Sequence, residues 1–405
     1  MKRNKEEVIR TVKEENIRSI RLAFCDVFGR LKNISITPEE LSEAFSIGVP
    51  INAAAVKDFG EGIFCDLFLH PEPETFSLLP WQPKDDMVAR MFCSMTYPDG
   101  TPFVERGTKS LLLKAIKEAE ELGYEFYFGT ELSYYLFKLD ANDNPTAEPV
   151  DDAGYLDVEP DDGCEDIRRQ VNHALRYMDV KPNDMFHLSG PGQNMIDFGL
   201  ANPLRAGDSI ITAKTIIRLT AKNNGLFADF SPKPLEGKRG NALHIKFSVL
   251  ANDGNSNALS NAVAGILDKA RDMTLFFNAT PEAYKRLGRD GAPKYISWST
   301  ENRSQLLRIP ESGTHMHSAE CRLANSSVNP YLAFALIIQA SLHGIKNNLT
   351  LPEVSNFSFS LAEPEVLSQY EKLPETFIDA CRIAEQSDFI KEILPDDIIK
   401  LYLNK

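Results

Sequence analysis

The sequence predicts an α+β protein in which a small β-rich part precedes a larger part that mixes helices and strands. Two observations indicate this class. Before about residue 95, apolar side chains alternate with polar ones along short segments, as they do in half-buried strands. From residue 108 onward, longer segments carry apolar residues at helical spacing and are interleaved with further strand-like runs. The chain has 405 residues, of which 43% are apolar, and this length suits two domains better than one core.

The N-terminal part is predicted to be a small β-rich domain. Apolar residues alternate over 20–24 and again from Ile34, and the Gly-containing turn at 26–30 between them predicts a hairpin. The proline-rich stretch 71–83 cannot continue a central strand. The run Tyr97-Pro98-Asp99-Gly100-Thr101-Pro102 is a strong turn signal. We therefore divide the chain at this turn into two domains, residues 1–100 and residues 101–405.

The larger domain should begin with a helix. Thr108 can cap that helix and Gly123 can end it, with apolar residues at helical spacing between them. The polar run 140–154 is rich in Asp, Asn and Pro, which predicts a solvated loop. Further amphipathic helices are predicted around residues 167–178, 210–222 and 331–343. Strands are predicted around Glu131, His187, Phe227, His244 and Glu320.

Composition excludes several classes of function. The net charge of -14 disfavours nucleic acid or an anionic membrane as the main partner, since no basic run offsets it. The charged N-terminus is not followed by an apolar stretch, so neither a signal peptide nor a membrane span is predicted, and a cytoplasmic location is expected. The six cysteines include no Cys-x-x-Cys pair, which is typical of reduced core thiols.

Four motifs carry a family resemblance that spans about residues 15 to 350. They are Phe128-Gly129-Thr130-Glu131-Leu132-Ser133-Tyr134-Tyr135-Leu136-Phe137, Ser231-Pro232-Lys233-Pro234, Asn302-Arg303-Ser304 with Arg308-Ile309-Pro310, and Asn329-Pro330-Tyr331-Leu332-Ala333-Phe334-Ala335. Together they resemble the glutamine synthetase family. The resemblance implies an N-terminal β-grasp domain and a catalytic domain whose curved antiparallel sheet, flanked by helices, forms a funnel for nucleotide and glutamate. It also implies rings of subunits, a dodecamer or a similar assembly, with each active site between neighbours.

Three residues of the predicted strands form a candidate metal site. Because side chains alternate along a strand, a funnel lined by these strands would bring together Glu131, His244 and Glu320. Two carboxylates and an imidazole suit a hard divalent cation that also takes phosphate oxygens, such as Mg²⁺ or Mn²⁺. In the family, the matching residues hold the metal that binds the nucleotide, so one such site and ATP or ADP are expected. The alternative is that each is an ordinary polar residue.

Arginines form a second constellation. Guanidinium groups suit bidentate contact with phosphoryl or carboxylate oxygens. By resemblance, Arg303, Arg308 and Arg322 are expected to stabilise a transferred phosphoryl group, and Arg286 and Arg322 to bind the substrate carboxylate. Gly240 matches a glycine whose backbone approaches the substrate. We assign nucleotide binding to Lys246, Ser248 and Arg308, since Lys246 and Ser248 share the face of His244.

Other family positions have changed. The three glutamates of the second metal fall on Ser133, Leu188 and Met195, which cannot hold a hard cation. The aspartate that binds ammonium across the subunit boundary falls on Asn52, and Gly291 stands near the place of the flap glutamate, with Asp290 as the nearest substitute.

Three further positions differ from the family residues. Lys246 replaces a histidine, Arg239 an asparagine and Ser318 an arginine. His315 and His317 are expected to belong to a loop rather than to a metal site.

These losses predict a glutamine synthetase-like protein that binds a nucleotide with one divalent cation, while glutamine formation from glutamate and ammonia is lost or strongly impaired. A divergent ATP-dependent carboxylate-amine ligase or phosphotransferase with another acid or amine is one alternative. A noncatalytic subunit or sensor is the other. The retained Glu131, His244 and Glu320 favour the ligase, whereas Leu188, Met195 and Asn52 favour the noncatalytic role.

Overall fold

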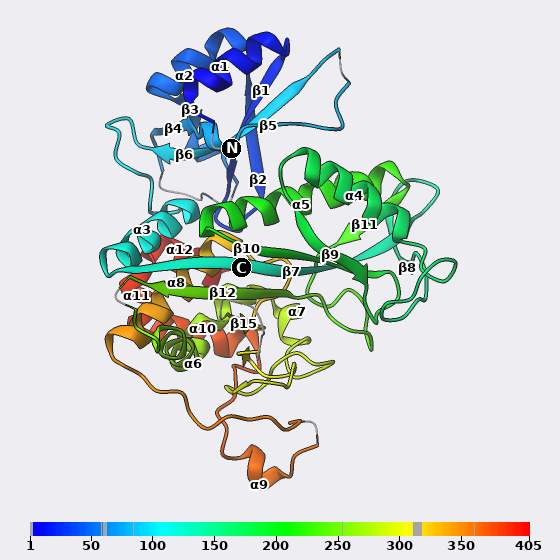
Figure 1. The fold of residues 1–405 in the computed structure, drawn as a ribbon, viewed down its shortest axis with the longest axis vertical. Helices are drawn as coiled ribbons and strands as arrows, with labels where there is room; N and C mark the ends of the chain where they lie inside the picture. Colours follow the sequence, from blue (N-terminus) through cyan, green and yellow to red (C-terminus); the bar gives the residue numbers. More distant parts are fainter. Residues whose placement is uncertain are drawn as a thin grey trace.

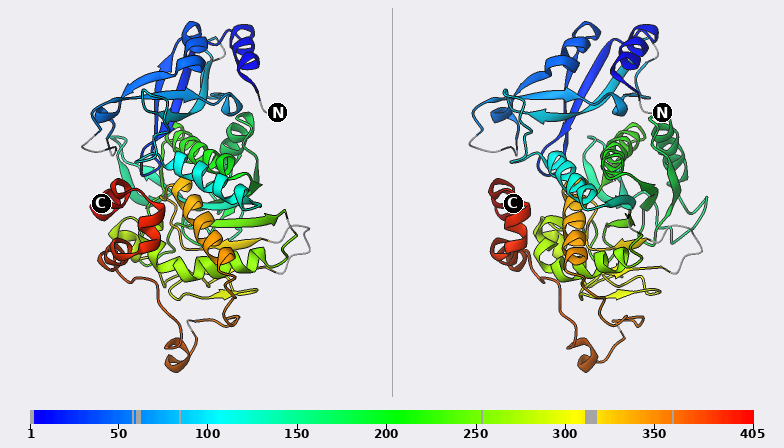
Figure 2. Two further views of the ribbon diagram at one scale, coloured as in Figure 1. Left: turned by 90° about the vertical axis from the view of Figure 1, so that its left-hand side faces the viewer. Right: turned by 60° about the vertical axis from the view of Figure 1, so that its left-hand side comes forward.

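A computed structural model gives the fold, which is α+β as the sequence predicts (Figure 1). It describes residues 3–57, 59, 63–83, 85–252, 254–310, 318–359 and 361–405. A small N-terminal β-grasp domain lies at one end of the molecule, and the larger part is built on a long curved sheet flanked by helices (Figures 1 and 2). Among the described helices, none combines the length and apolar character needed to cross a bilayer.

The N-terminal sheet contains the predicted hairpin. Within the described residues it has the order β2-β1-β6-β4-β3, with β5 paired to β6, and only β1 and β6 run parallel. The turn of the hairpin requires Gly29, whose φ is +76° and whose position lies against the Asn329 backbone. The strands are β1 (Ser19–Cys25), β2 (Leu31–Ile36), β3 (Val49–Asn52), β4 (Asp66–Pro71), β5 (Ser77–Leu78) and β6 (Val88–Thr96).

The second sheet is the larger one. Within the described residues its order is β13-β14-β15-β12-β7-β10-β9, and β8 and β11 also pair with the long strand β7. Its pairs are antiparallel except for β13 with β14. The strands are β7 (Tyr124–Leu139), β8 (Pro145–Pro149), β9 (Pro182–His187), β10 (Gln193–Ala201), β11 (Leu226–Asp229), β12 (Leu243–Ala251), β13 (Trp298–Ser299), β14 (Leu307–Arg308) and β15 (Ala319–Cys321).

The helices complete the fold. The longer ones are α1 (Lys5–Glu14), α2 (Leu41–Ile47), α3 (Thr108–Glu121), α4 (Glu165–Tyr177), α5 (Pro203–Asn223), α6 (Ala258–Phe277), α8 (Pro330–Lys346), α10 (Phe377–Gln386), α11 (Asp388–Ile393) and α12 (Asp396–Leu403). The short ones are α7 (Pro281–Tyr284) and α9 (Pro364–Leu367), with single 3-10 turns at Pro38–Glu40, Ala53–Ala55 and Pro73–Thr75.

A layer of helices packs on one face of the larger sheet. Every second side chain of β7 points into this layer, and the ring of Phe128 stacks on that of Phe334 in α8 at 4.4 Å. Helices α6 and α8 cross so closely that a Cβ added at Gly265 or at Gly344 would lie 2.1 Å from a backbone oxygen of the other helix. The intervening residues of β7 therefore point to the opposite face.

Three predicted boundaries need correction. Thr108 is the first residue of α3 rather than its cap, and Gly107 occupies the cap position. Helix α5 begins earlier than predicted, at Pro203, because the side chain of Asn202 accepts the Arg205 amide hydrogen and caps it. The predicted loop 140–154 contains strand β8, which pairs with the end of β7 where that strand extends beyond its core partners.

Candidate active site

The three predicted metal ligands lie together on the face of the sheet opposite the helices. The register places Glu131 of β7 directly across from His244 of β12, and Lys246 across from Glu320 of β15. The ligand atoms of Glu131, His244 and Glu320 all lie within 4.8 Å of one another. Each glutamate approaches the imidazole, since His244 Nδ1 is 3.1 Å from Glu131 Oε2 and 3.5 Å from Glu320 Oε1.

Cationic side chains already contact both carboxylates. Lys246 Nζ lies 2.9 Å from Glu131 Oε1 and 2.9 Å from Asp197 Oδ2, so it bridges two strands. Arg322 Nη1 donates to Glu320 Oε1 at 2.5 Å. Arg308 Nη1 lies 3.7 Å from the other oxygen of Glu320. The site is therefore a row of alternating charges whose carboxylates are neutralised by the protein itself.

These contacts determine the protonation of the site. Burial would raise the pKa of Glu131, but its hydrogen bond with His244 and the charge of Lys246 outweigh burial and hold that pKa well below its usual range. Burial, and then the charge of Arg322, lowers the pKa of His244, against the pull of the glutamates. Although burial opposes it, the charges of Glu131 and Asp197 raise the pKa of Lys246. At neutral pH the site thus has an ionised Glu131, a neutral imidazole and a charged ammonium.

This donor set fits one divalent cation of the Mg²⁺ or Mn²⁺ type. Two carboxylates and one neutral imidazole are suitable ligands, and a cation held there would neutralise phosphate oxygens. The fit has a cost, because a metal would compete with Lys246 for Glu131 and with Arg322 for Glu320. We therefore expect the metal to bind more weakly than it would to free carboxylates.

The positions of a second metal do not fit such an ion. The Ser133 hydroxyl is engaged with the backbone of Ala242, donating to its oxygen at 3.1 Å and accepting from its nitrogen at 2.8 Å. Leu188 and Met195 are 5% and 4% exposed and have no oxygen to offer. No catalytic step through a second cation is supported by these residues.

Arg286 and Gly240 form a second part of the site. A Cβ at Gly240 would lie 2.6 Å from Pro232 O and 2.7 Å from Arg286 Cγ, so only glycine fits there. Arg286 is 3% exposed and donates to Leu323 O at 2.6 Å, while its Nε has no partner among the described residues. Burial, and then the charge of Arg322, lowers the pKa of Arg286. A buried and uncompensated guanidinium is suited to binding a carboxylate.

The remaining predicted residues are more scattered. Arg303 is exposed, and the structure gives it no hydrogen bond or ion pair with any described residue. Ser248 is buried on β12. Asn52 is exposed at the end of β3, on the N-terminal domain. Asp290, the nearest substitute for the flap glutamate, forms an ion pair with Lys233 at 2.8 Å. Its carboxylate is therefore already engaged. His315 and His317 lie outside the described residues.

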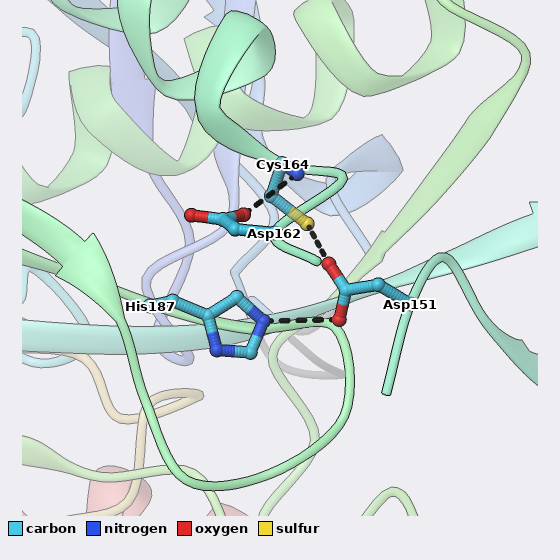
Figure 3. A group of neighbouring side chains, drawn as sticks. All are labelled: Asp151, Asp162, Cys164 and His187. Carbon is cyan, nitrogen blue, oxygen red and sulfur yellow. Dashed lines mark hydrogen bonds and ion pairs between the residues drawn. The ribbon is translucent and has the colours of Figure 1, made fainter. Parts of the chain in front are cut away.

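A further cluster of possible ligands was not recognised in the sequence (Figure 3). Asp151 Oδ1 lies 3.0 Å from His187 Nε2, and the Cys164 thiol donates to Asp151 Oδ2 at 3.3 Å. Backbone amides of Gly192 and Gly163 also donate to the Asp151 carboxylate. Asp162 is engaged by Arg168 and by the Cys164 amide. Because the oxygens of both aspartates are satisfied, we interpret the cluster as a buried structural network.

Sequence reasoning also missed the role of Asp197. The sequence did indicate which way Asp197 points. It lies two residues after Met195 and therefore shares the face of β10 on which Met195 lies. The register places it directly across from Glu131. The bridging position of Lys246 depends on both carboxylates and was not predictable without the pairing of the strands.

Comparisons with known proteins identify relatives along the whole chain. The sequence profile of the glutamine synthetase catalytic domain matches residues 105–405, and that of the glutamine synthetase β-grasp domain matches residues 16–98. A glutamine synthetase of Methanosarcina mazei is 37% identical, covering 98% of this chain and 92% of the relative. One of Clostridium saccharobutylicum is 35% identical, covering 99% of this chain and 94% of the relative.

Solved structures share the fold. A GmaS–ADP complex has a TM-score of 0.87 at 21% identity, covering 100% of this chain and 94% of that one. The glutamine synthetase of Plasmodium falciparum has a TM-score of 0.84 at 18% identity, covering 99% of this chain and 95% of that one. At these identities the likeness shows the architecture alone.

Proposed function

Because the chain belongs to the glutamine synthetase family, we propose that it binds a nucleotide together with one divalent cation and has lost ordinary glutamine formation. Glu131, His244 and Glu320 would hold the cation, and Arg308 with Lys246 and Ser248 would face the nucleotide. The observation that carries the proposal is a contrast on one sheet face. One set of cation ligands converges within 4.8 Å, while the positions of the other hold Ser133, Leu188 and Met195. The cytoplasmic location stays a prediction from the sequence.

The first test of this proposal is nucleotide binding. We expect ADP or ATP with Mg²⁺ to raise the melting temperature of the protein, and the increase to shrink strongly in Glu320→Gln, which weakens both the cation site and its contacts with Arg322 and Arg308. Differential scanning fluorimetry measures the shift with and without Mg²⁺. Glu125→Gln, at an exposed position of β7, is the matched control. Equal nucleotide-induced shifts in both variants would place the nucleotide elsewhere.

The second test concerns Lys246. Replacing it by Gln removes the ammonium that competes for Glu131, so we expect Mn²⁺ to bind Lys246→Gln about tenfold or more tightly than the unmodified protein. Titration calorimetry, or Mn²⁺ paramagnetic resonance, measures the dissociation constant. The control is Lys138→Gln, which alters an exposed lysine on the same strand as Glu131, β7. This variant should leave the dissociation constant for Mn²⁺ unchanged. An unchanged constant in Lys246→Gln would show that the ammonium does not compete with the metal.

A divergent carboxylate-amine ligase or phosphotransferase is the second candidate function. It is favoured by the buried Arg286, whose Nε has no partner among the described residues, next to Arg322. In that case Arg286 and Arg322 would bind the carboxylate of another acid, and Arg303, Arg308 and Arg322 would stabilise the transferred phosphoryl group. A noncatalytic subunit or sensor would keep the nucleotide site and bind the same ligands without turnover.

Self-association in rings is part of the proposal. Asn52 is exposed on β3 of the N-terminal sheet, whereas the candidate cation ligands lie on β7, β12 and β15 of the larger sheet. In a ring it would face a neighbour's site. We expect multi-angle light scattering at micromolar concentration to give a mass of many subunits, and a stable monomer would contradict this part of the proposal.

A further inference from the structure

A large cavity lies between the N-terminal domain and the face of α5. Its volume is about 830 Å³, enough for a small organic ligand. It is lined by the β1–β2 hairpin, by α5 and by the loop at Ser231 to Lys233, and none of the candidate metal ligands takes part. The cavity is therefore separate from the site on the sheet.

The charge of this cavity contrasts with that of the chain. Eight basic side chains and one acidic side chain line it, in a protein of net charge -14. The charges come from both domains, with Arg21 and Arg90 on the N-terminal sheet and Lys214, Arg218 and Lys222 on α5. Among the described residues, no carboxylate forms an ion pair with any of these five side chains. The excess of basic over acidic side chains on the walls favours an anion.

Arg90 gives independent support. It is 6% exposed, its Nη2 donates to Thr212 Oγ1 at 2.9 Å, and its Nε has no partner among the described residues. A buried guanidinium with one unsatisfied N–H is costly unless a ligand supplies an acceptor for it. Arg90 lines this cavity and also a smaller one that contains Glu72 and Asp208, and a ligand in the larger cavity could supply the acceptor.

Lys214 repeats this situation on the opposite wall. It is also 6% exposed, and its ammonium makes a hydrogen bond to the backbone oxygen of Val328 at 3.0 Å. Burial, and then the charge of Arg218, lowers the pKa of Lys214 to about 7. The guanidinium of Arg218 lies over the ring of Phe230, at 4.8 Å from its centroid, and forms no ion pair with a described carboxylate, although the charge of Asp229 partly offsets the effect of burial on its pKa. An anion between the two walls would offset charges that burial otherwise penalises.

We propose that this cavity binds a small organic anion that carries two or more carboxylate or phosphate groups. Charged groups of the ligand would contact Arg90 and Arg21 on one side and Lys214 and Arg218 on the other. The walls also include apolar side chains such as Phe28, Leu79 and Trp81, which suit the carbon skeleton of an organic molecule better than a hydrated inorganic ion. Because it joins the two domains, the ligand would stabilise their packing.

The test measures anion binding to the purified full-length protein. Titration calorimetry and thermal shifts are recorded with succinate and citrate as carboxylates, with glucose 6-phosphate as a phosphate ester, and with glucose as an uncharged control, all at one ionic strength. We expect at least one of these anions to bind with a stoichiometry near one per chain and glucose to have no effect. The two anion classes show whether carboxylate or phosphate is the group recognised.

Variants locate the site. Lys214→Met removes a buried charge while keeping the volume, and Arg218→Gln removes a charge from a more exposed residue of α5, with circular dichroism checking that both variants are folded. Each is expected to weaken binding about tenfold or more. Lys117→Ala, on the exposed side of α3, is the control and should bind normally. Binding that survives both cavity variants but is lost in Arg322→Gln would place the anion in the candidate active site and overturn the proposal. So would an absence of binding by every anion, as expected if an acidic segment of a second copy fills the cavity.

Discussion

Purified protein is expected to form no measurable glutamine from glutamate, ammonia and ATP. In the proposed function, Ser133, Leu188 and Met195 stand at the positions of a second metal, so the substrate carboxylate would lack a cation to bind and polarise it. A missing general base alone typically costs about 100- to 10,000-fold in rate. Asn52 supplies no charge for ammonium, and Asp290 is held by Lys233. These losses need not add fully, because groups that act together are not independent.

A coupled assay for ATP hydrolysis, with direct detection of glutamine, measures this outcome. Any glutamine must disappear in Glu320→Gln, since otherwise it comes from a contaminating enzyme. Robust synthesis that this substitution abolishes would show that the losses are compensated, with Asp290 released from Lys233 as the first candidate base. Substitution of Asp290 by Asn would then identify it.

The largest effect on stability is expected from Arg168→Leu. Arg168 forms an ion pair with the fully buried carboxylate of Asp162 and donates to Asn194 Oδ1 at 2.6 Å. Removing one partner of a buried pair leaves an uncompensated charge, which costs about 3–5 kcal/mol of unfolding free energy. Asp162 also accepts the Cys164 amide hydrogen where α4 begins, so the loss should loosen the network drawn in Figure 3.

Urea denaturation with linear extrapolation measures the change. The neighbouring Arg169 is the matched control, since its side chain is 63% exposed and pairs with Asp166 on the surface. Arg169→Leu should change stability by less than about 1 kcal/mol. In the double variant with Asp162→Asn, much of the loss should be recovered, because the buried negative charge is gone. Equal effects of the two arginine variants would refute the importance of the buried pair.

The sequence predicted the fold class and the positions of several elements because these depend on local patterns, but α1, α6 and the helices from α10 onward were not predicted. Alternation showed which side chains share a face within each strand, and helical spacing gave α3, α4, α5 and α8. The convergence of Glu131, His244 and Glu320 was predicted from the family resemblance. What the sequence could not provide was the pairing of distant strands. The contacts of Lys246 with Asp197 and Glu131 require β10, β7 and β12 to lie side by side in one register.

The same limit applies to the other sites. The network around Asp151 joins loop residues to strand β9 across 36 positions, and no spacing rule connects them. The cationic cavity collects side chains from both domains, although each stretch of sequence contains only ordinary basic residues. The cation site was predictable although its residues lie on three distant strands, because the motifs around them resemble a known family. The other two clusters carry no such motif, so they became visible only in the packed structure.

The two faces of strand β7 differ in how well they should tolerate substitution. On one face, Phe128 stacks on α8, where the close crossing of α6 and α8 leaves no room for larger residues. On the other face, the Ser133 hydroxyl contacts the backbone of Ala242, and Glu131 contacts His244 and Lys246 of strand β12. A substitution on that face would therefore alter the chemistry of the candidate site with less effect on the helix layer than a substitution on the face of Phe128.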